Sequence, residues 1–137
     1  MKLTTKGHYA VTAMLDLALH SDDRPIRLAD ISSRHNISVS YLEQLFTKFR
    51  RHDLVTSVRG PGGGYRLSRD SKDIFVAQVI DAINEDTHPV GRRSLADDKK
   101  HLANELWGDL SGQIHKFLSE ISLASLVESR NYIVDST

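Results

Sequence analysis

Hydrophobic residues recur at helical spacing over three stretches in the first half of the chain, which predicts three helices. We expect the first from about His8 to His20, with Pro25 preventing its continuation. The second fits Leu28 to His35, followed by Asn36 in a left-handed turn. The third begins near Ser38, a residue type that caps helices. Its apolar face consists of Leu42, Leu45, Phe46 and Phe49.

Two strand-like runs at positions 54–58 and 65–68 flank the glycine-rich segment RGPGGGY, residues 59–65, and predict a β-hairpin. A helix of about ten residues follows the hairpin. Its inward positions are Val76, Val79, Ile80 and Ile83. The glycines do not fit a nucleotide-binding loop, because the known glycine motifs for phosphate open a helix. Here Gly64 is followed by Tyr65 and a strand.

Three helices followed by a hairpin have the order of a winged helix-turn-helix, so we expect a mostly α fold with a small β-hairpin wing. In such domains the second helix of the motif enters the DNA major groove. Glycines at the wing tip let the backbone approach a phosphate closely. Arg59, at the base of the wing, is suited to a narrow minor groove. The alternative is an ordinary hairpin whose glycines only make a turn.

A second unit is predicted after a segment at 86–98 that has no apolar period and reads as a loop. From Lys99 to about Ser122 a long helix is expected, spanning roughly 35 Å at about 1.5 Å per residue. This is longer than the small N-terminal core can cover, so we expect a homodimer joined along the helix. The dimerisation positions are Leu102, Leu106, Leu110, Ile114, Phe117 and Ile121. A short helix at 125–129 and a mobile tail at 131–137 complete the chain.

Composition adds limits to this picture. The chain has 137 residues, 39% of them hydrophobic, and no apolar run near 18 residues, so neither a membrane span nor a secretion leader is expected. The absence of cysteine excludes disulfides and thiolate metal sites. We therefore expect a cytoplasmic protein. Residues 1–69 hold eleven Lys and Arg against six Asp and Glu, whereas residues 70–137 hold seven against twelve. A basic first half favours a polyanionic partner.

The stretches LTTKGHYAVTAMLDLAL and SYLEQLF, with VRGPGGGY after them, closely resemble the Rrf-two family of bacterial transcription regulators, and in particular its IscR-like members. The resemblance covers residues 1–85 and resumes at 105–127, which looks like the family's dimerisation helix and its follower. It implies a DNA-binding domain at 1–85, a loop at 86–98 that is a sensor loop in relatives, and a dimerisation helix with a tail at 99–137. It also implies binding to palindromic promoter DNA as a homodimer, with repression or activation of nearby genes.

The resemblance carries individual residues to the DNA interface. The recognition helix offers Ser38, Ser40, Tyr41, Glu43 and Gln44, and the wing offers Arg59, Gly60, Gly62 and Gly63. Gln44 suits an adenine edge, while Glu43 either accepts from cytosine, repels phosphates or is a solvated charge. The candidates for contacts with the phosphates of the DNA backbone are Lys48, Arg50, Arg51, Lys6 and Tyr9. For the first three a solvated helix end, and for Tyr9 a core position, is the alternative.

The chain departs from cluster-binding members of that family, which carry three cysteines in the loop before the dimerisation helix. No cysteine is present, and no Ala or Ser stands at the spacing of a laboratory substitution, so we expect a natural member without a cysteine-held iron–sulfur cluster. Imidazole and carboxylate also bind zinc or ferrous iron. The candidate ligands are His88, His101, Asp97, Asp98 and His8. They form no H-x3-H or H-E-x-x-H pair, so neither a metal site nor a cofactor is expected.

Two classes of function remain at this point, and a third is not expected. The first is a dimeric, sequence-specific regulator, a repressor or an activator, that binds promoter DNA constitutively or answers to an effector. The second is a module that keeps the fold but signals through a partner enzyme. An enzyme is not expected, since no nucleophilic triad, paired carboxylates or phosphate loop has the required context.

Overall fold

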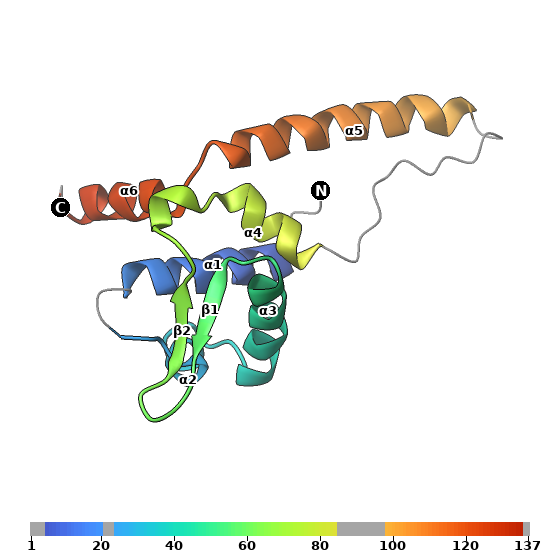
Figure 1. Cartoon of the computed structure of the whole chain (residues 1–137). Helices are drawn as coiled ribbons and strands as arrows, with labels where there is room; N and C mark the ends of the chain where they lie inside the picture. The colour runs from blue at the N-terminus through green and yellow to red at the C-terminus, as the bar shows by residue number, and fades with distance from the viewer. Residues whose placement is uncertain (1–4, 21–23, 85–97, 136–137) are drawn as a thin grey trace.

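The computed structural model describes residues 5–20, 24–84 and 98–135 (Figure 1). The helices in these ranges are α1 (Thr5–Leu19), α2 (Leu28–His35), α3 (Val39–Arg51), α4 (Val76–Ile83), α5 (Asp98–Ser119) and α6 (Leu123–Asp135). The strands are β1 (Val55–Val58) and β2 (Gly64–Leu67), and a short 3-10 helix, η1, covers Ser71–Asp73. The expected fold class, mostly α with a hairpin wing, is confirmed.

The hydrophobic core forms where α1, α3 and α4 meet. The predicted apolar face of α3 is confirmed, because Leu42, Leu45, Phe46 and Phe49 are all at most 1% exposed. The rings of Phe46 and Phe49 lie 5.2 Å apart, edge to face, an arrangement that stabilises aromatic pairs beyond their buried area. Leu123, at the start of α6, is also fully buried in this core. The C-terminal part of the chain therefore contributes to the same core as the first helix.

The wing is an antiparallel hairpin in which Val55 faces Leu67 and Val58 faces Gly64. The connection between α1 and α2 adds one more rung, since Ile26 and Tyr65 exchange both backbone hydrogen bonds, at 2.9 and 2.8 Å. A Cβ on Gly64 would lie 2.4 Å from the carbonyl oxygen of Ile26, a distance that no side chain tolerates. Gly64 is therefore needed to attach the wing to the body of the domain.

Several predicted boundaries differ from the structure. The first helix begins at Thr5, before the expected His8, and α5 covers Asp98–Ser119 where 99–122 was expected. The expected short helix at 125–129 is longer, because residues 131–135, which were expected to form a tail, belong to α6. The physical reason lies at the start of α6, where the Ser122 hydroxyl accepts a hydrogen bond from the Ser125 N–H at 3.1 Å. This cap and the burial of Leu123 in the core fix the first turn of α6.

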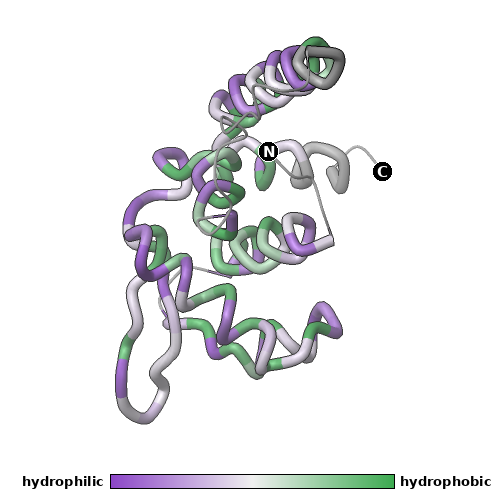
Figure 2. Tube along the Cα trace, turned by 90° about the vertical axis from the view of Figure 1, so that its right-hand side faces the viewer, coloured by the Kyte–Doolittle hydropathy of each residue, from purple (hydrophilic) through white to green (hydrophobic). Residues whose placement is uncertain are grey.

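α5 lies over α4 and its first half projects beyond the rest of the protein (Figure 1). Figure 2, turned so that α5 is seen nearly end-on, shows it standing above the other helices. Two contacts anchor its C-terminal end: His115 Nε2 lies 2.9 Å from Asp81 Oδ2, and the carbonyl of Ile121, just after the helix, accepts from the Val76 N–H at 2.9 Å. The wing tip and the N-terminal end of α3 lie on the opposite side of the protein from α5 (Figure 1).

Candidate nucleic-acid interface

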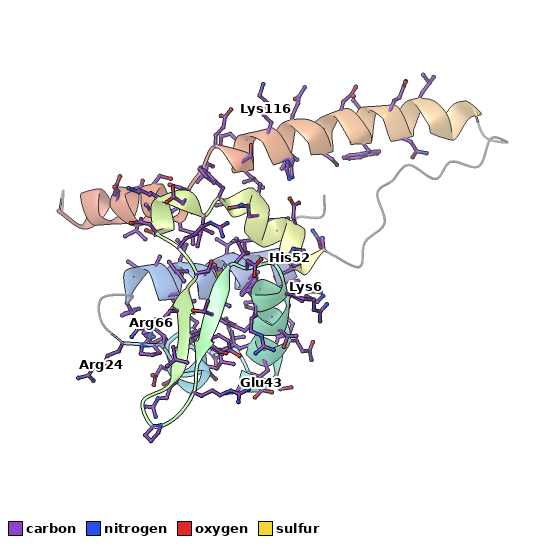
Figure 3. The ribbon with its side chains drawn as sticks, viewed as in Figure 1. Lys6, Arg24, Glu43, His52, Arg66 and Lys116 are labelled. Atoms are coloured by element: carbon purple, nitrogen blue, oxygen red, sulfur yellow. The ribbon has the colours of Figure 1, made fainter. Side chains whose placement is uncertain are left out.

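The expected recognition helix, α3, presents one buried and one exposed side. Its start is fixed by Ser38, whose hydroxyl oxygen accepts a hydrogen bond from the Tyr41 N–H at 3.1 Å. This is the N-cap expected from the sequence. On the side opposite the core, exposed residues follow one another over more than two turns. They are Val39, Ser40, Glu43, Gln44 and Thr47. Figure 3 shows Glu43 pointing away from the core, beside the wing.

The tip of the wing lies on the same side of the protein as the N-terminal end of α3 (Figure 1). The Gly63 N–H donates to the Gly60 carbonyl at 2.9 Å, which closes a turn, and Gly60 and Gly62 have φ angles of 100° and 75°. Both have open space where a side chain would stand, so a ligand can reach their backbone. A Cβ on Gly63 would instead meet the Val58 carbonyl oxygen at 2.3 Å. We call the exposed residues of α3 together with residues 59–62 of the wing the α3–wing surface.

Arg59 is the cation of the wing part of this surface. It is exposed, and it makes no hydrogen bond or ion pair with the residues that the structure describes. A guanidinium has five N–H donors and no acceptor, so it suits a phosphate or the negative potential of a groove. Nothing within the described parts of the protein competes for these donors.

Two tyrosines join α1 to the recognition helix. The rings of Tyr9 and Tyr41 lie 5.7 Å apart, edge to face, and both residues are half-buried against the core. Burial raises the pKa of the Tyr41 hydroxyl, Tyr9 raises it further, and Lys48 opposes them. Tyr41 therefore stays a neutral donor at physiological pH. Tyr9 packs against the core but keeps part of its surface exposed. Its position is therefore compatible with both alternatives, a core residue and a DNA contact.

The remaining cationic candidates are less well placed. Lys48 is half-buried, and its ammonium group donates to the Ile83 carbonyl at 3.3 Å, so it also holds the last turn of α4. Figure 3 places Lys6 well away from the wing tip. Arg50 and Arg51 are exposed near the end of α3.

Sequence analysis missed a buried charge cluster that fixes α2 against α1. Asp16 is 1% exposed and accepts two hydrogen bonds from the Arg34 guanidinium, at 2.8 and 2.7 Å. His35 Nε2 lies 2.8 Å from one carboxylate oxygen, and His20 Nδ1 lies 3.5 Å from the other. Burial alone would raise the pKa of Asp16, but the hydrogen bonds and charges of its partners outweigh it, and the pKa is lowered from 3.8. The signal in the sequence was a carboxylate within an apolar helix face.

The metal candidates do not form a site in the described parts of the protein. His88 and Asp97 lie outside those parts. Asp98 and His101 belong to the first turn of α5, but their side chains are not among those described, and His8 is exposed on α1. No group of three or more metal-binding side chains occurs among the side chains that are described.

The apolar stripe of α5 is exposed. Leu102 is 70% exposed, Leu106 66% and Phe117 64%, with Leu110 and Trp107 also exposed nearby. Ile114 and Ile121 are half-buried at the border with α4. This face is the largest run of apolar side chains on the described surface, although no helix there is long and apolar enough to span a membrane.

Comparison with known proteins identifies the family. The model of the Rrf2 family, described as iron-dependent transcriptional regulators, matches residues 3–129. A protein of Azotobacter vinelandii provisionally named HTH-type transcriptional regulator ORF2 is 63% identical over 130 residues, covering 93% of this chain and 79% of its own. The HTH-type transcriptional regulator IscR of Xenorhabdus nematophila is 53% identical over 136 residues, covering 97% and 83%.

Solved structures agree with the sequence comparison. T. potens IscR superposes with a TM-score of 0.76 at 35% identity, covering 95% of this chain and 88% of its own. CymR, the global cysteine regulator of B. subtilis, superposes with a TM-score of 0.76 at 30% identity, covering 94% and 98%. The resemblance seen in the sequence is confirmed, and these relatives are regulators rather than enzymes. The chain therefore belongs to the Rrf2 family and is a DNA-binding transcription regulator of the IscR-like type.

Proposed function

We propose that two copies of this chain join along α5 and bind palindromic promoter DNA, each placing α3 in a major groove and its wing in the adjacent minor groove. The observation that carries this proposal is the α3–wing surface, which combines a continuous exposed helix face with Arg59 of the wing, a cation that has no hydrogen-bond or ion-pair partner among the described residues. The basic first half of the chain supports attraction to a polyanion. Because promoter DNA of the bacterial relatives lies in the cytoplasm, we place the protein there.

Individual roles follow from side-chain chemistry. Gln44 donates to and accepts from an adenine edge, and Glu43 accepts from a cytosine amino group. The hydroxyl groups of Ser38, Ser40 and Tyr41 donate hydrogen bonds to phosphates or bases, while Arg59 enters the minor groove. Gly60 and Gly62 bring the backbone of the wing close to a phosphate, with Gly63 shaping the turn. We expect weaker contacts with the DNA backbone from Tyr9, Lys6, Lys48 and Arg51. Lys48, for example, already donates a hydrogen bond to the last residue of α4.

The dimer is supported by the exposed stripe of α5. An apolar face of this size on a protein surface marks an interaction site, and a closed two-fold pair is the commonest way to cover it. The first half of α5 projects beyond the body of the protein, so no other described element of the same chain covers Leu102 or Leu106 (Figure 1).

The iron–sulfur cluster implied by IscR-like relatives does not fit the residues of this chain. Such clusters are held mainly by cysteine thiolates, and the chain has no cysteine. We therefore propose that it binds DNA without a cysteine-held cluster. Anaerobic treatment with iron and sulfide should leave the protein colourless. A stoichiometric cluster with visible charge-transfer absorbance would overturn this part of the proposal.

Selection of duplexes from a random pool tests the main proposal. The purified protein should enrich a palindromic sequence and should bind it at least about a thousandfold more tightly than random duplex at physiological salt. Equal affinity for all sequences would overturn the proposal. It would favour the second candidate, a module that signals through a partner enzyme. Adding zinc or ferrous iron to the same assay tests the His and Asp candidates, and a metal-dependent change in affinity would establish metal sensing.

A further inference from the structure

The large hydrophobic side chains exposed on the described surface fall into two groups. Five lie on α5 and belong to the proposed dimer interface. The other two are Val39 and Val58, each 39% exposed, and both lie on the elements that form or border the α3–wing surface. An exposed valine on a surface built for DNA calls for a contact that is apolar.

Val39 is the first residue of α3, directly after the Ser38 cap. Neither packing nor helix formation explains it, since its side chain is not in the core and valine is a weaker helix former than alanine. It lies one turn before Glu43 on the same face, and Ser40 follows it. The cap fixes the position of this first turn relative to the rest of the helix.

The residues at the N-terminal end of a recognition helix contact base edges. In the major groove the apolar group that a base offers is the C5-methyl of thymine. A β-branched side chain is stiff about χ1, so valine loses little freedom on making this contact. We propose, on the basis of the function proposed above, that Val39 reads the C5-methyl group of one thymine in each half-site.

The position of Glu43 sharpens the proposal. Residues one helical turn apart have Cβ atoms about 5–6 Å apart, and successive base pairs are about 3.4 Å apart along the duplex. The thymine read by Val39 therefore lies one or two base-pair steps from the base that Glu43 faces.

The test uses the duplex enriched by selection, with each thymine replaced in turn by uracil, which lacks only the methyl group. For the unaltered protein, replacing one particular thymine in each half-site should lower the affinity for the duplex about fourfold, the effect of one buried methyl group. For Val39→Ala the same replacement should cost less than about twofold, because the apolar partner is gone. Alanine favours the helix, so this variant keeps its fold, which circular dichroism checks.

Val58→Ala is the matched control, since it removes the same atoms from an equally exposed valine of the wing. It should keep the fourfold loss at the thymine assigned to Val39. At that position, replacing the thymine pair by cytosine–guanine should weaken binding, and 5-methylcytosine should recover part of the affinity only when Val39 is present. This arm separates the methyl group from the rest of the base.

Uracil losses that are the same in the unaltered protein and in Val39→Ala would overturn the inference, as would the absence of any thymine with a methyl-dependent loss. Either result leaves the proposed function intact, because sequence-specific binding would already have been measured. Failure to enrich any sequence would overturn both.

Discussion

At the scale of single residues, Arg59 allows the contribution of the wing to be isolated. It has no partner in the described protein, so its removal does not disturb the fold. Arg59→Ala should weaken binding to the selected duplex by about 1–3 kcal/mol, measured by fluorescence anisotropy at constant salt. Lys116→Ala removes one positive charge from α5, on the side opposite the wing, and should change affinity much less (Figure 3). Equal losses in the two variants would mean that only net charge matters.

Asp16 illustrates a residue whose role is structural. Its buried carboxylate is held by Arg34 and His35, so Asp16→Ala leaves these donors without their acceptor. We expect a loss of about 2–4 kcal/mol in the free energy of unfolding at pH 7, measured with urea. Asp16→Asn, which keeps shape and one acceptor, should lose less. If the free energy of unfolding changes by less than about 0.5 kcal/mol in both variants, the Asp16 cluster does not stabilise the fold.

The pH dependence of this cluster has a definite sign. The pKa of Asp16 is lowered in the folded state, so the carboxylate binds its proton less readily there than in the unfolded chain. The contribution of this carboxylate to folding stability is therefore present above its pKa in the unfolded chain, near 3.8. It is lost as the pH falls through the lower pKa of the folded state. The unaltered protein should lose stability below about pH 4 more steeply than Asp16→Asn, whose amide does not titrate. Urea midpoints at pH 5, 4 and 3 give the comparison, and parallel curves would contradict it.

At the scale of elements, the attachment of the wing depends on Gly64. In Gly64→Ala the new Cβ would collide with the Ile26 backbone, which cannot move without breaking the Ile26–Tyr65 rung. We expect a loss of about 1–3 kcal/mol in the free energy of unfolding. Gly112→Ala is the contrasting control, because its Cβ meets nothing within 4 Å in the interior of α5. Alanine there should raise helix stability by about 0.5–1 kcal/mol, so the two variants should differ in sign.

The helices and the wing also show which structural features the sequence pattern could predict and which it could not. Periodicity predicted α2 and α3 well, because each buries one side and has clear signals at its ends. It also predicted α4, although that helix is buried on nearly all sides, with only Gln78 and Asp81 exposed. It could not identify the Asp16 cluster, since a carboxylate reads as solvated until its partners, 18 and 19 residues away, are known to fold beside it. Nor could it assign separate roles to the glycines: Gly62 needs a left-handed turn, whereas Gly64 needs space against a distant backbone. The DNA contacts remain predictions at every position.

At the scale of the whole molecule, the proposed dimer depends on the exposed apolar stripe of α5. Burying one leucine contributes about 1.5–3 kcal/mol, and a two-fold interface uses each position twice. Leu106→Glu should therefore convert a dimer into a monomer at micromolar concentration, measured by sedimentation velocity. Leu106 is 66% exposed in the single chain, so the variant should keep its fold as a monomer, which circular dichroism checks. Gly108→Glu introduces the same charge on the opposite side of α5, where space is open, and should remain dimeric.

The same pair of variants connects assembly to DNA binding. Two recognition helices on one palindrome require half-sites about one helical turn apart, 34–36 Å in the usual case. A monomer of Leu106→Glu engages one half-site at a time, so its affinity for the full palindrome should fall to its affinity for an isolated half-site. Gly108→Glu should keep the preference for the full site. If Leu106→Glu is monomeric and still binds the palindrome as tightly as the unaltered protein, the α3–wing surface acts alone and the α5 face serves another partner.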